Sequence, residues 1–201
     1  MQHILQLIKK LKADGLIIHV NPLQEWLQPE GDRFEFSPIE TMQNILHLNE
    51  YPVVVKEVGQ GFGYESMCAL MQLPLAAIEF AAAGGTNFAQ LELLRSDAAR
   101  KELYGSFAQV GHSAEEMVGF VNRAILELGE NIKCDNFIIS GGISNFLDGF
   151  YCLKKINANA VYGQASAFLK FAQGDYATLQ KYITAQIEGL AMAYSFLSVK
   201  D

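Results

Sequence analysis

The sequence predicts an α/β fold in which short parallel strands alternate with helices. Five runs rich in β-branched and aromatic residues recur along the 201 residues, and a helical pattern lies between successive runs. Several runs are apolar at consecutive positions, which is typical of strands buried on both faces of a parallel sheet. A loop rich in glycine and small polar residues follows each run, so these loops would gather at the carboxyl edge of the sheet, where α/β folds place their ligand sites.

The expected elements follow from these patterns in chain order. A first helix is expected because Met1, Ile4, Ile8 and Leu11 recur at helical spacing with lysines between them. The strands are expected at residues 15–20, 52–58, 76–80, 136–140 and 159–163. The further helices are expected at residues 37–48, 64–73, 113–128, 145–156 and 176–197, with another helix starting at residue 89.

The number of strands indicates an incomplete barrel. A complete eight-stranded (β/α)8 TIM barrel needs about 250 residues, whereas only five strand–helix units can be counted here. We therefore expect residues 1–201 to form one domain that is part of such a barrel. An open five-stranded sheet would expose two apolar edges, and these edges would favour association with another chain or segment.

Composition excludes several classes of function. A net charge of −7 and an isoelectric point near 5.1 argue against a nucleic-acid partner, which needs a basic surface. No signal-peptide pattern is recognised, and no run approaches the roughly 18 apolar residues of a membrane span, so we expect a cytoplasmic protein without a membrane partner. Three widely spaced cysteines suggest neither disulfides nor zinc, and Cys68 and Cys152 are expected to be buried in helices.

Three loops combine glycine with small polar residues, at positions 84–88, 140–145 and 163–168. Paired glycines let the backbone approach a phosphate or a planar ring, although glycine pairs are also common in ordinary turns. Ser144 or Asn145 would cap the helix that follows the second loop. The candidate ligand-binding residues of these loops are Thr86, Gly141, Gly142, Ala165 and Ser166.

Charged residues near the ends of two strands are further candidates. Lys56 ends an apolar run and is costly to bury unless an anion meets it, and near a flavin it would stabilise the reduced ring. Its alternative role is a lysine whose head reaches water. Glu25, beside Gln24, offers the hard oxygen that suits Mg²⁺, and its alternative is a solvated loop glutamate.

His19, Asn21 and Glu92 are candidates for the rim of the site. His19 and Asn21 lie on one side of an alternating stretch, so either a ligand contact or a structural hydrogen bond is open to them. Glu92 is placed on the first turn of the helix after the first glycine loop. There it would act in acid–base chemistry or only complement the helix dipole.

The ordered series of motifs resembles the type 2 isopentenyl-diphosphate isomerases, which are FMN-dependent (β/α)8-barrel enzymes. The motifs that carry the resemblance are HVNPLQE, QPEGDR, VVVKEVGQG, GGTNFAQLELLR, SGGI and GQASAF. These enzymes convert isopentenyl diphosphate to dimethylallyl diphosphate in isoprenoid biosynthesis, and they use NAD(P)H only to reduce the flavin. The resemblance covers nearly the whole chain, whereas the N-terminal strands of the family's barrel have no counterpart.

The resemblance implies a role for each candidate residue. Gln24 would contact the diphosphate substrate near its reacting carbons, with Asn21 lining the site, and Glu25 would hold Mg²⁺. Lys56 and Thr86 would contact FMN. The FMN phosphate would be enclosed by Gly141, Gly142, Ala165 and Ser166. Catalytic roles would fall to Gln24, with weaker assignments to His19 and Glu92, in a homo-oligomer.

Two alternatives remain open from the sequence. One is another flavin- or phosphate-binding barrel oxidoreductase related to α-hydroxy-acid oxidases, which would carry a His-x-x-Arg motif near the end of the chain, and the sequence has none. The other is a non-catalytic fragment that folds or associates only with a partner segment.

Overall fold

Five short parallel strands form one sheet at the centre of the protein. The structure, a computed structural model, describes residues 2–48 and 50–200, so the predicted helical position Met1 lies outside the described residues. The sheet order is β1-β2-β3-β4-β5, and every neighbouring pair is parallel. The strands are β1 (Leu16–His19), β2 (Val53–Lys56), β3 (Ala77–Glu79), β4 (Asn136–Ile139) and β5 (Asn159–Tyr162). All five lie within the predicted strand ranges.

Helices connect the strands, as the sequence predicts. The α-helices are α1 (Gln2–Leu11), α2 (Pro22–Leu27), α3 (Pro38–Leu48), α4 (Tyr64–Met71), α5 (Phe88–Arg95), α6 (Ala98–Tyr104), α7 (Ala114–Leu128), α8 (Phe146–Lys155), α9 (Ser166–Ala172) and α10 (Tyr176–Phe196). Two 3₁₀ turns are η1 (Gly105–Gln109) and η2 (Gly129–Asn131). The short helices α2, α6 and α9 were not predicted. No helix in the described part of the chain has the length and apolarity to cross a membrane.

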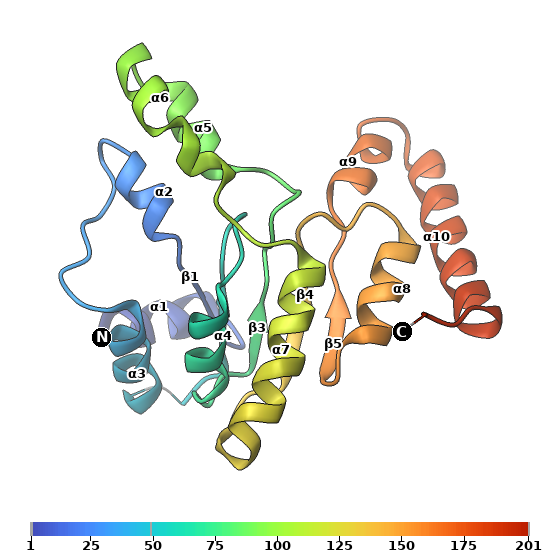
Figure 1. The fold of residues 1–201 in the computed structure, drawn as a ribbon, viewed down its shortest axis with the longest axis horizontal. Helices are drawn as coiled ribbons and strands as arrows, with labels where there is room; N and C mark the ends of the chain where they lie inside the picture. The colour runs from blue at the N-terminus through green and yellow to red at the C-terminus, as the bar shows by residue number, and fades with distance from the viewer. Residues whose placement is uncertain (1, 49, 201) are drawn as a thin grey trace.

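The main core lies between the sheet and the helices α3, α4, α7 and α8 (Figure 1). Side chains alternate across each strand, so Val53 and Val55 of β2 face this core and are almost completely buried. On the edge strands the opposite face is open, because Ile17 is 63% exposed and Val161 is 61% exposed. The predicted burial of both sheet faces is therefore wrong for the described residues, in which helices cover one face only.

The architecture confirms the α/β class and matches part of a TIM-like barrel. Sequential parallel strands joined by helices on one face are the arrangement that such barrels use. Among the described residues, β1 and β5 form the two edges and do not pair with each other. Cys134 and Cys152 are buried as small apolar side chains, whereas Cys68 is only half-buried, contrary to expectation.

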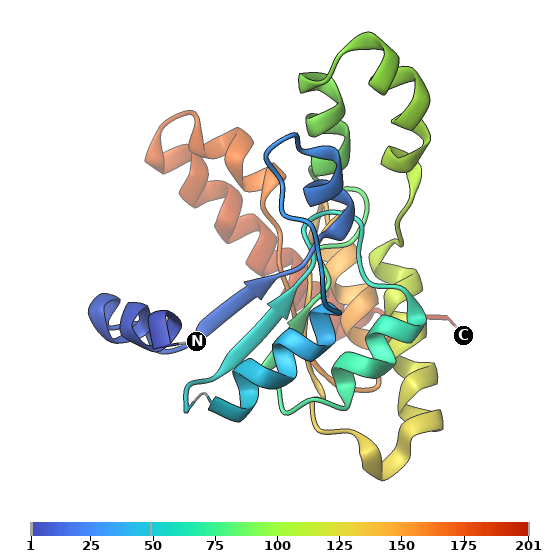
Figure 2. The same cartoon turned by 90° about the vertical axis from the view of Figure 1, so that its left-hand side faces the viewer.

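A second, smaller core lies beyond the carboxyl ends of the strands. We call the helices α2, α5 and α6 with η1 the helical cap, and they project from the sheet in Figures 1 and 2. The buried side chains of the cap core are Leu27, Ala89, Leu93 and Ala108. Trp26 adds edge-to-face contacts with Tyr104 and Phe107. The helices α9 and α10 form a separate hairpin beside α8 (Figure 1).

The contact between α8 and β5 gives a first prediction. A Cβ added at Gly149 would lie 2.6 Å from ring carbons of Tyr162, whereas one added at Gly119 of α7 meets no atom within 4 Å. We expect Gly149→Ala to lower the free energy of unfolding by about 1–3 kcal/mol through overpacking. The control Gly119→Ala should raise it by about 0.5–1 kcal/mol, since alanine favours the helix. Urea unfolding checks both, and equal midpoints for the two variants would contradict the packing described.

Candidate functional site

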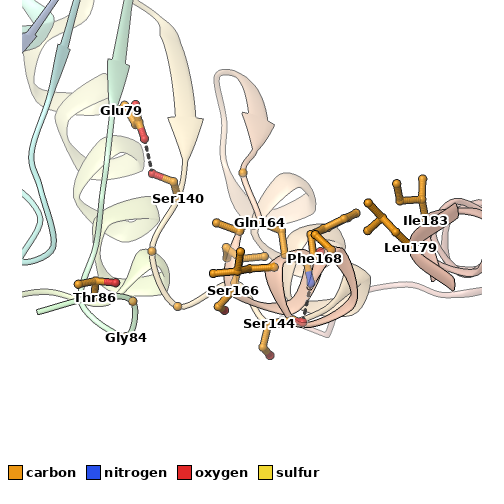
Figure 3. A pocket seen from close by; sticks show the side chains of 18 residues that line it. Glu79, Gly84, Thr86, Ser140, Ser144, Gln164, Ser166, Phe168, Leu179 and Ile183 are labelled. Atoms are coloured by element: carbon orange, nitrogen blue, oxygen red, sulfur yellow. Dashed lines mark hydrogen bonds between the residues drawn. The ribbon is translucent and has the colours of Figure 1, made fainter. Parts of the chain in front are cut away.

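A cavity of about 760 Å³ lies at the carboxyl ends of β3, β4 and β5. The loops after these three strands supply its polar wall, including Gly84, Thr86, Gly141 and Ser166. Figure 3 shows Thr86 and Gly84 at one side, Ser166 and Gln164 in the middle, and Leu179 and Ile183 of α10 at the far side. The cavity therefore pairs a polar, glycine-rich wall with an apolar one, as many cofactor sites do.

Two glycine loops touch each other on the floor of this cavity. Gly84, Gly141 and Gly142 have φ values of +110°, +88° and +73°, which residues with side chains rarely adopt. A Cβ on Gly84 would lie 2.8 Å from Gly142 Cα, and one on Gly141 would lie 2.1 Å from Ala82 O. Glycine is thus required here both for backbone conformation and for the close approach of the two loops.

Several polar groups in the cavity have no protein partner. Within the described residues, the amides of Gly141 and Gly142 and the hydroxyls of Thr86 and Ser166 make no hydrogen bond. Gln164 donates through Nε2 to the Ser144 carbonyl at 2.6 Å, but its Oε1 is buried and accepts no hydrogen bond. Free amides and hydroxyls suit phosphate oxygens, and a buried acceptor needs a donor such as an N–H or hydroxyl of a ligand.

The start of α8 is already capped by its own residues. Asn145 is the N-cap, as predicted, and its Oδ1 accepts from the amides of Leu147 and Asp148. The Asp148 carboxylate accepts hydrogen bonds from the Ser144 amide at 2.9 Å and the Asn145 amide at 3.2 Å. Burial raises the pKa of Asp148, but hydrogen bonds from Ser144 and Asn145 outweigh burial and lower that pKa below its ordinary value. An anion would therefore meet the preceding glycines rather than this capped helix end.

Polar side chains also end the strands on the open face of the sheet. Ser140 donates from Oγ to Glu79 Oε1 at 2.9 Å, and both residues line the cavity (Figure 3). Lys56 pairs in register with Glu79 on one side and His19 on the other. Its Nζ donates to the Glu57 carbonyl at 2.7 Å, and Lys56 does not line the cavity. Lys56 is thus placed one strand away from the cavity lining.

The loop after β2 is organised by a buried carboxylate that the sequence analysis did not single out. Glu57 is 5% exposed, and its Oε2 accepts from the amides of Gly59, Gln60 and Gly61 at 2.7, 2.6 and 2.9 Å. Hydrogen bonds from several amides satisfy a buried carboxylate without a cation. The E-x-G-x-G spacing was the available signal, since it brings three successive amides within reach of one side chain.

The end of β1 forms a second group of candidate residues. Asn21 is buried and caps α2, because its Oδ1 accepts from the Gln24 amide at 2.8 Å. Its Nδ2 is buried without a partner. His19 is exposed on the open face of the sheet. Gln24 and Glu25 lie half-buried on α2 of the helical cap, and neither of them lines the cavity.

One carboxylate oxygen of Glu25 is held in place by the chain. Its Oε2 accepts from the Asp32 amide at 3.0 Å, while Oε1 makes no hydrogen bond within the described residues. No group of three or more histidine, cysteine, aspartate or glutamate side chains in the described residues could hold a metal ion. The donor set fits a hydrated Mg²⁺ that one carboxylate and a ligand's phosphates share, but not a metal held by the protein alone.

The prediction that Glu92 lies on the first turn of its helix is wrong, because the helix begins one residue earlier than expected. The helix α5 begins at Phe88, so Glu92 lies on its second turn, where it is 5% exposed. Its carboxylate accepts from Gln28 Nε2 at 2.9 Å and from Arg95 Nη1 at 2.8 Å. Arg95 also pairs with Glu30 at 2.9 Å. In this arrangement Glu92 ties α5 to the loop after α2 within the cap.

The structure thus separates the predicted site residues into two groups. Thr86, Gly141, Gly142, Ala165 and Ser166 line one cavity, as expected for one ligand site. The second group, at the β1 edge, contains His19, Asn21, Gln24 and Glu25. Lys56 lies between the two groups in the sheet. Both groups lie at or beyond the carboxyl ends of strands, the first in the segments after β3, β4 and β5 and the second at the end of β1 and on α2.

Comparisons with known proteins find relatives that match most of this chain. A protein of Rickettsia peacockii (strain Rustic) is 32% identical over 185 residues, which cover 92% of this chain and 52% of the relative. One of Listeria monocytogenes serotype 4a (strain HCC23) is 34% identical over 149 residues, 74% of this chain and 39% of the relative. Both are named isopentenyl-diphosphate delta-isomerase.

This chain is similar to isopentenyl-diphosphate delta-isomerases. It spans about half the length of the curated relatives it matches. A Rickettsia felis protein of the same name gives the same extent of match, 92% of this chain and 51% of the relative, at 30% identity. No protein-family model matches the chain.

The capped start of α8 gives a pH-dependent prediction. Because the folded-state pKa of Asp148 is lowered, its carboxylate stabilises the fold above the ordinary pKa of 3.8, and this contribution is lost as the pH falls through the folded-state pKa. We expect Asp148→Asn to lower the urea midpoint at pH 7, and the difference from the native chain to shrink below about pH 4. A difference that is constant from pH 7 to pH 3 would contradict the assignment.

Proposed function

We propose that this chain carries the FMN- and diphosphate-binding portion of a type 2 isopentenyl-diphosphate isomerase. The supporting observation is the similarity to proteins named isopentenyl-diphosphate delta-isomerase over 92% of the chain. The reaction would move the double bond of isopentenyl diphosphate to give dimethylallyl diphosphate, by addition of one proton and removal of another. The FMN-dependent type is favoured because the matched region contains a cavity with features suited to a flavin phosphate.

The cavity would hold FMN by groups that are free in the structure. The amides of Gly141 and Gly142 and the Ser166 hydroxyl would bind the phosphate, with Ala165 leaving room beside them. The buried Gln164 Oε1 would accept a hydrogen bond from the cofactor. When bound and reduced by NAD(P)H, FMN would supply the acid–base group of the reaction.

The β1 side of the site would bind the substrate. Glu25 would hold Mg²⁺ on the substrate diphosphate through its unengaged oxygen, and the adjacent Gln24 would contact the substrate near its reacting carbons. Asn21 would fix this geometry by capping α2. Lys56, lying in register between His19 and Glu79, would bring a positive charge to the flavin side. Such fixed charges act most strongly where water is excluded.

Activity would require further strands that close the barrel. The open face of the sheet exposes Ile17 on one edge strand and Val161 on the other, and both edges leave backbone groups unpaired in the described residues. Additional strand–helix units would pair these edges and cover the exposed side chains. Without them the chain would be a folded but non-catalytic fragment, which is the second candidate function.

FMN binding tests the phosphate assignment. We expect Ser166→Asp to weaken FMN binding by about tenfold or more, because it places a negative charge beside the phosphate. Riboflavin, which lacks the phosphate, should bind both proteins equally. Asp is favourable on the first turn of α9, so folding should be retained.

The matched control is Ser198→Asp, which adds the same charge outside the cavity lining. Flavin fluorescence titration measures all three proteins. Equal weakening of FMN and riboflavin by Ser166→Asp would contradict a phosphate site at this position.

Reconstitution tests the reaction itself. We expect the chain, combined with the segment of the Listeria relative that precedes its matched region, to convert isopentenyl diphosphate when FMN, Mg²⁺ and NAD(P)H are present. Gln24→Ala should reduce turnover by at least about a hundredfold, since positioning groups contribute that much. Product is measured by NMR. A stable complex that binds FMN but shows no turnover would favour the non-catalytic fragment.

A further inference from the structure

The loop after α2 folds back on the helix and is held there by one arginine. Arg33 donates from Nη1 to the carbonyls of Glu25 at 2.8 Å, Gly31 at 3.0 Å and Asp32 at 3.3 Å. Its Nη2 makes a longer contact of 3.5 Å with the Gln28 carbonyl. A planar guanidinium presents several donors in a fixed fork, so one side chain can hold several carbonyls at once.

The same loop also holds the Glu25 side chain. The amide of Asp32, next to Arg33 in sequence, donates to Glu25 Oε2 at 3.0 Å. Gly31 permits this approach, because a Cβ there would lie 2.0 Å from the Glu25 carbonyl oxygen. Arg33 fixes the backbone of Glu25 and of Asp32, and Asp32 in turn orients the carboxylate. The contacts therefore form a chain from the guanidinium to the Glu25 carboxylate.

Arg33 is exposed, and its guanidinium bonds to backbone carbonyls instead of to a carboxylate. Within the described residues it pairs with no carboxylate, although Glu25, Glu30 and Asp32 are all close in sequence. Glu30 is engaged instead by Arg95, and Gln28 donates to Glu92, so both anchor the loop to α5 of the helical cap. The hydrogen bonds from the Arg33 guanidinium thus all go to backbone carbonyls, of α2 and of the loop that follows it.

We propose that Arg33 is a positioning residue that sets the direction of the Glu25 carboxylate for a divalent cation. This inference rests on the proposed function, in which Glu25 holds the Mg²⁺ of a substrate diphosphate. Groups that orient a metal ligand typically change metal affinity 10–100-fold when they are removed. Arg33 would exert its effect without touching the cation or the substrate.

The direction in which cation affinity changes after removal of Arg33 distinguishes a positioning role from an effect of its charge. A guanidinium close to the Glu25 backbone repels a cation on the same residue, so loss of its charge alone should strengthen cation binding. Loss of positioning should weaken cation binding instead. Weaker binding after removal of Arg33 is therefore the result that positioning predicts, and the lost charge does not explain it.

The test uses Mn²⁺ together with inorganic diphosphate as the probe and the 201-residue chain in solution, because one carboxylate suits a cation that it shares with phosphate oxygens. Bound Mn²⁺ broadens the NMR signals of nearby amides, and the Asp32 amide, hydrogen-bonded to Glu25, reports the site directly. We expect half-broadening of the Asp32 signal to need about tenfold more Mn²⁺ in Arg33→Gln and also in Arg33→Lys, which keeps the charge but not the fork. The control Arg123→Gln removes another exposed arginine, on α7, and should leave the titration unchanged.

The outcomes separate this inference from the proposed function. If Glu25→Gln abolishes the broadening but Arg33→Gln leaves it unchanged or strengthens it, the positioning role is overturned and the metal role of Glu25 stands. Native cation affinity in Arg33→Lys would likewise overturn the inference, because lysine keeps the charge but lacks the planar guanidinium. If the native chain shows no broadening at Asp32, or Glu25→Gln retains it, the metal role itself is overturned and the positioning role with it.

Discussion

The five strands pair in parallel, and this pairing determines where the loops that follow them lie. Each neighbouring pair is in register, so every strand ends at the same edge of the sheet. The loops that follow must then lie side by side, whatever their individual sequences. The cavity between the loops after β3, β4 and β5, and the helical cap beyond β1, are both consequences of this single geometry. Because the helices pack on one face of the sheet, the other face stays open to a ligand, and the edge strands β1 and β5 stay open to further strands.

Buried and half-buried polar side chains hold this edge together by hydrogen bonds to loop backbone. Glu57 accepts from three amides, Asn21 caps α2, and Asp148 satisfies the start of α8. Each of these side chains organises one loop by hydrogen bonds to the backbone of that loop. Removing such a side chain would leave the backbone amides without an acceptor, which destabilises the fold. The amides of Gly141 and Gly142 remain free beside these satisfied groups. That contrast is the physical basis for placing a phosphate there.

The strands and long helices could be predicted because their signals are local. Runs such as VVVK and NFII are β-branched or aromatic and contain no breaker, and the structure confirms strands at both. The helix α2 was missed because Asn-Pro was taken as the end of a strand, although Asn at the N-cap and Pro at N1 are also a helix start. Glu92 was misplaced because α5 begins one residue earlier than expected, at Phe88.

Tertiary effects on the site could not be read from the sequence. Nothing in a linear pattern indicates that Glu92 would be bound by Gln28 and Arg95, since Gln28 lies 64 residues away. The open face of the sheet was equally unexpected, because consecutive apolar residues do not reveal whether both faces are covered. By contrast, the glycine pairs could be selected as candidate ligand loops from the sequence, and in the structure they line the cavity, where the close approach of the two backbones leaves few other residue types possible.

In the proposed site, the free amides of Gly141 and Gly142 bind the phosphate of a flavin. Amide NMR of the chain, with FMN and riboflavin compared at saturating concentrations, tests it most directly. We expect downfield shifts of both glycine amide protons with FMN and much smaller shifts with riboflavin, because riboflavin has no phosphate to accept hydrogen bonds from them. Saturable FMN binding that leaves these two signals unmoved would contradict it.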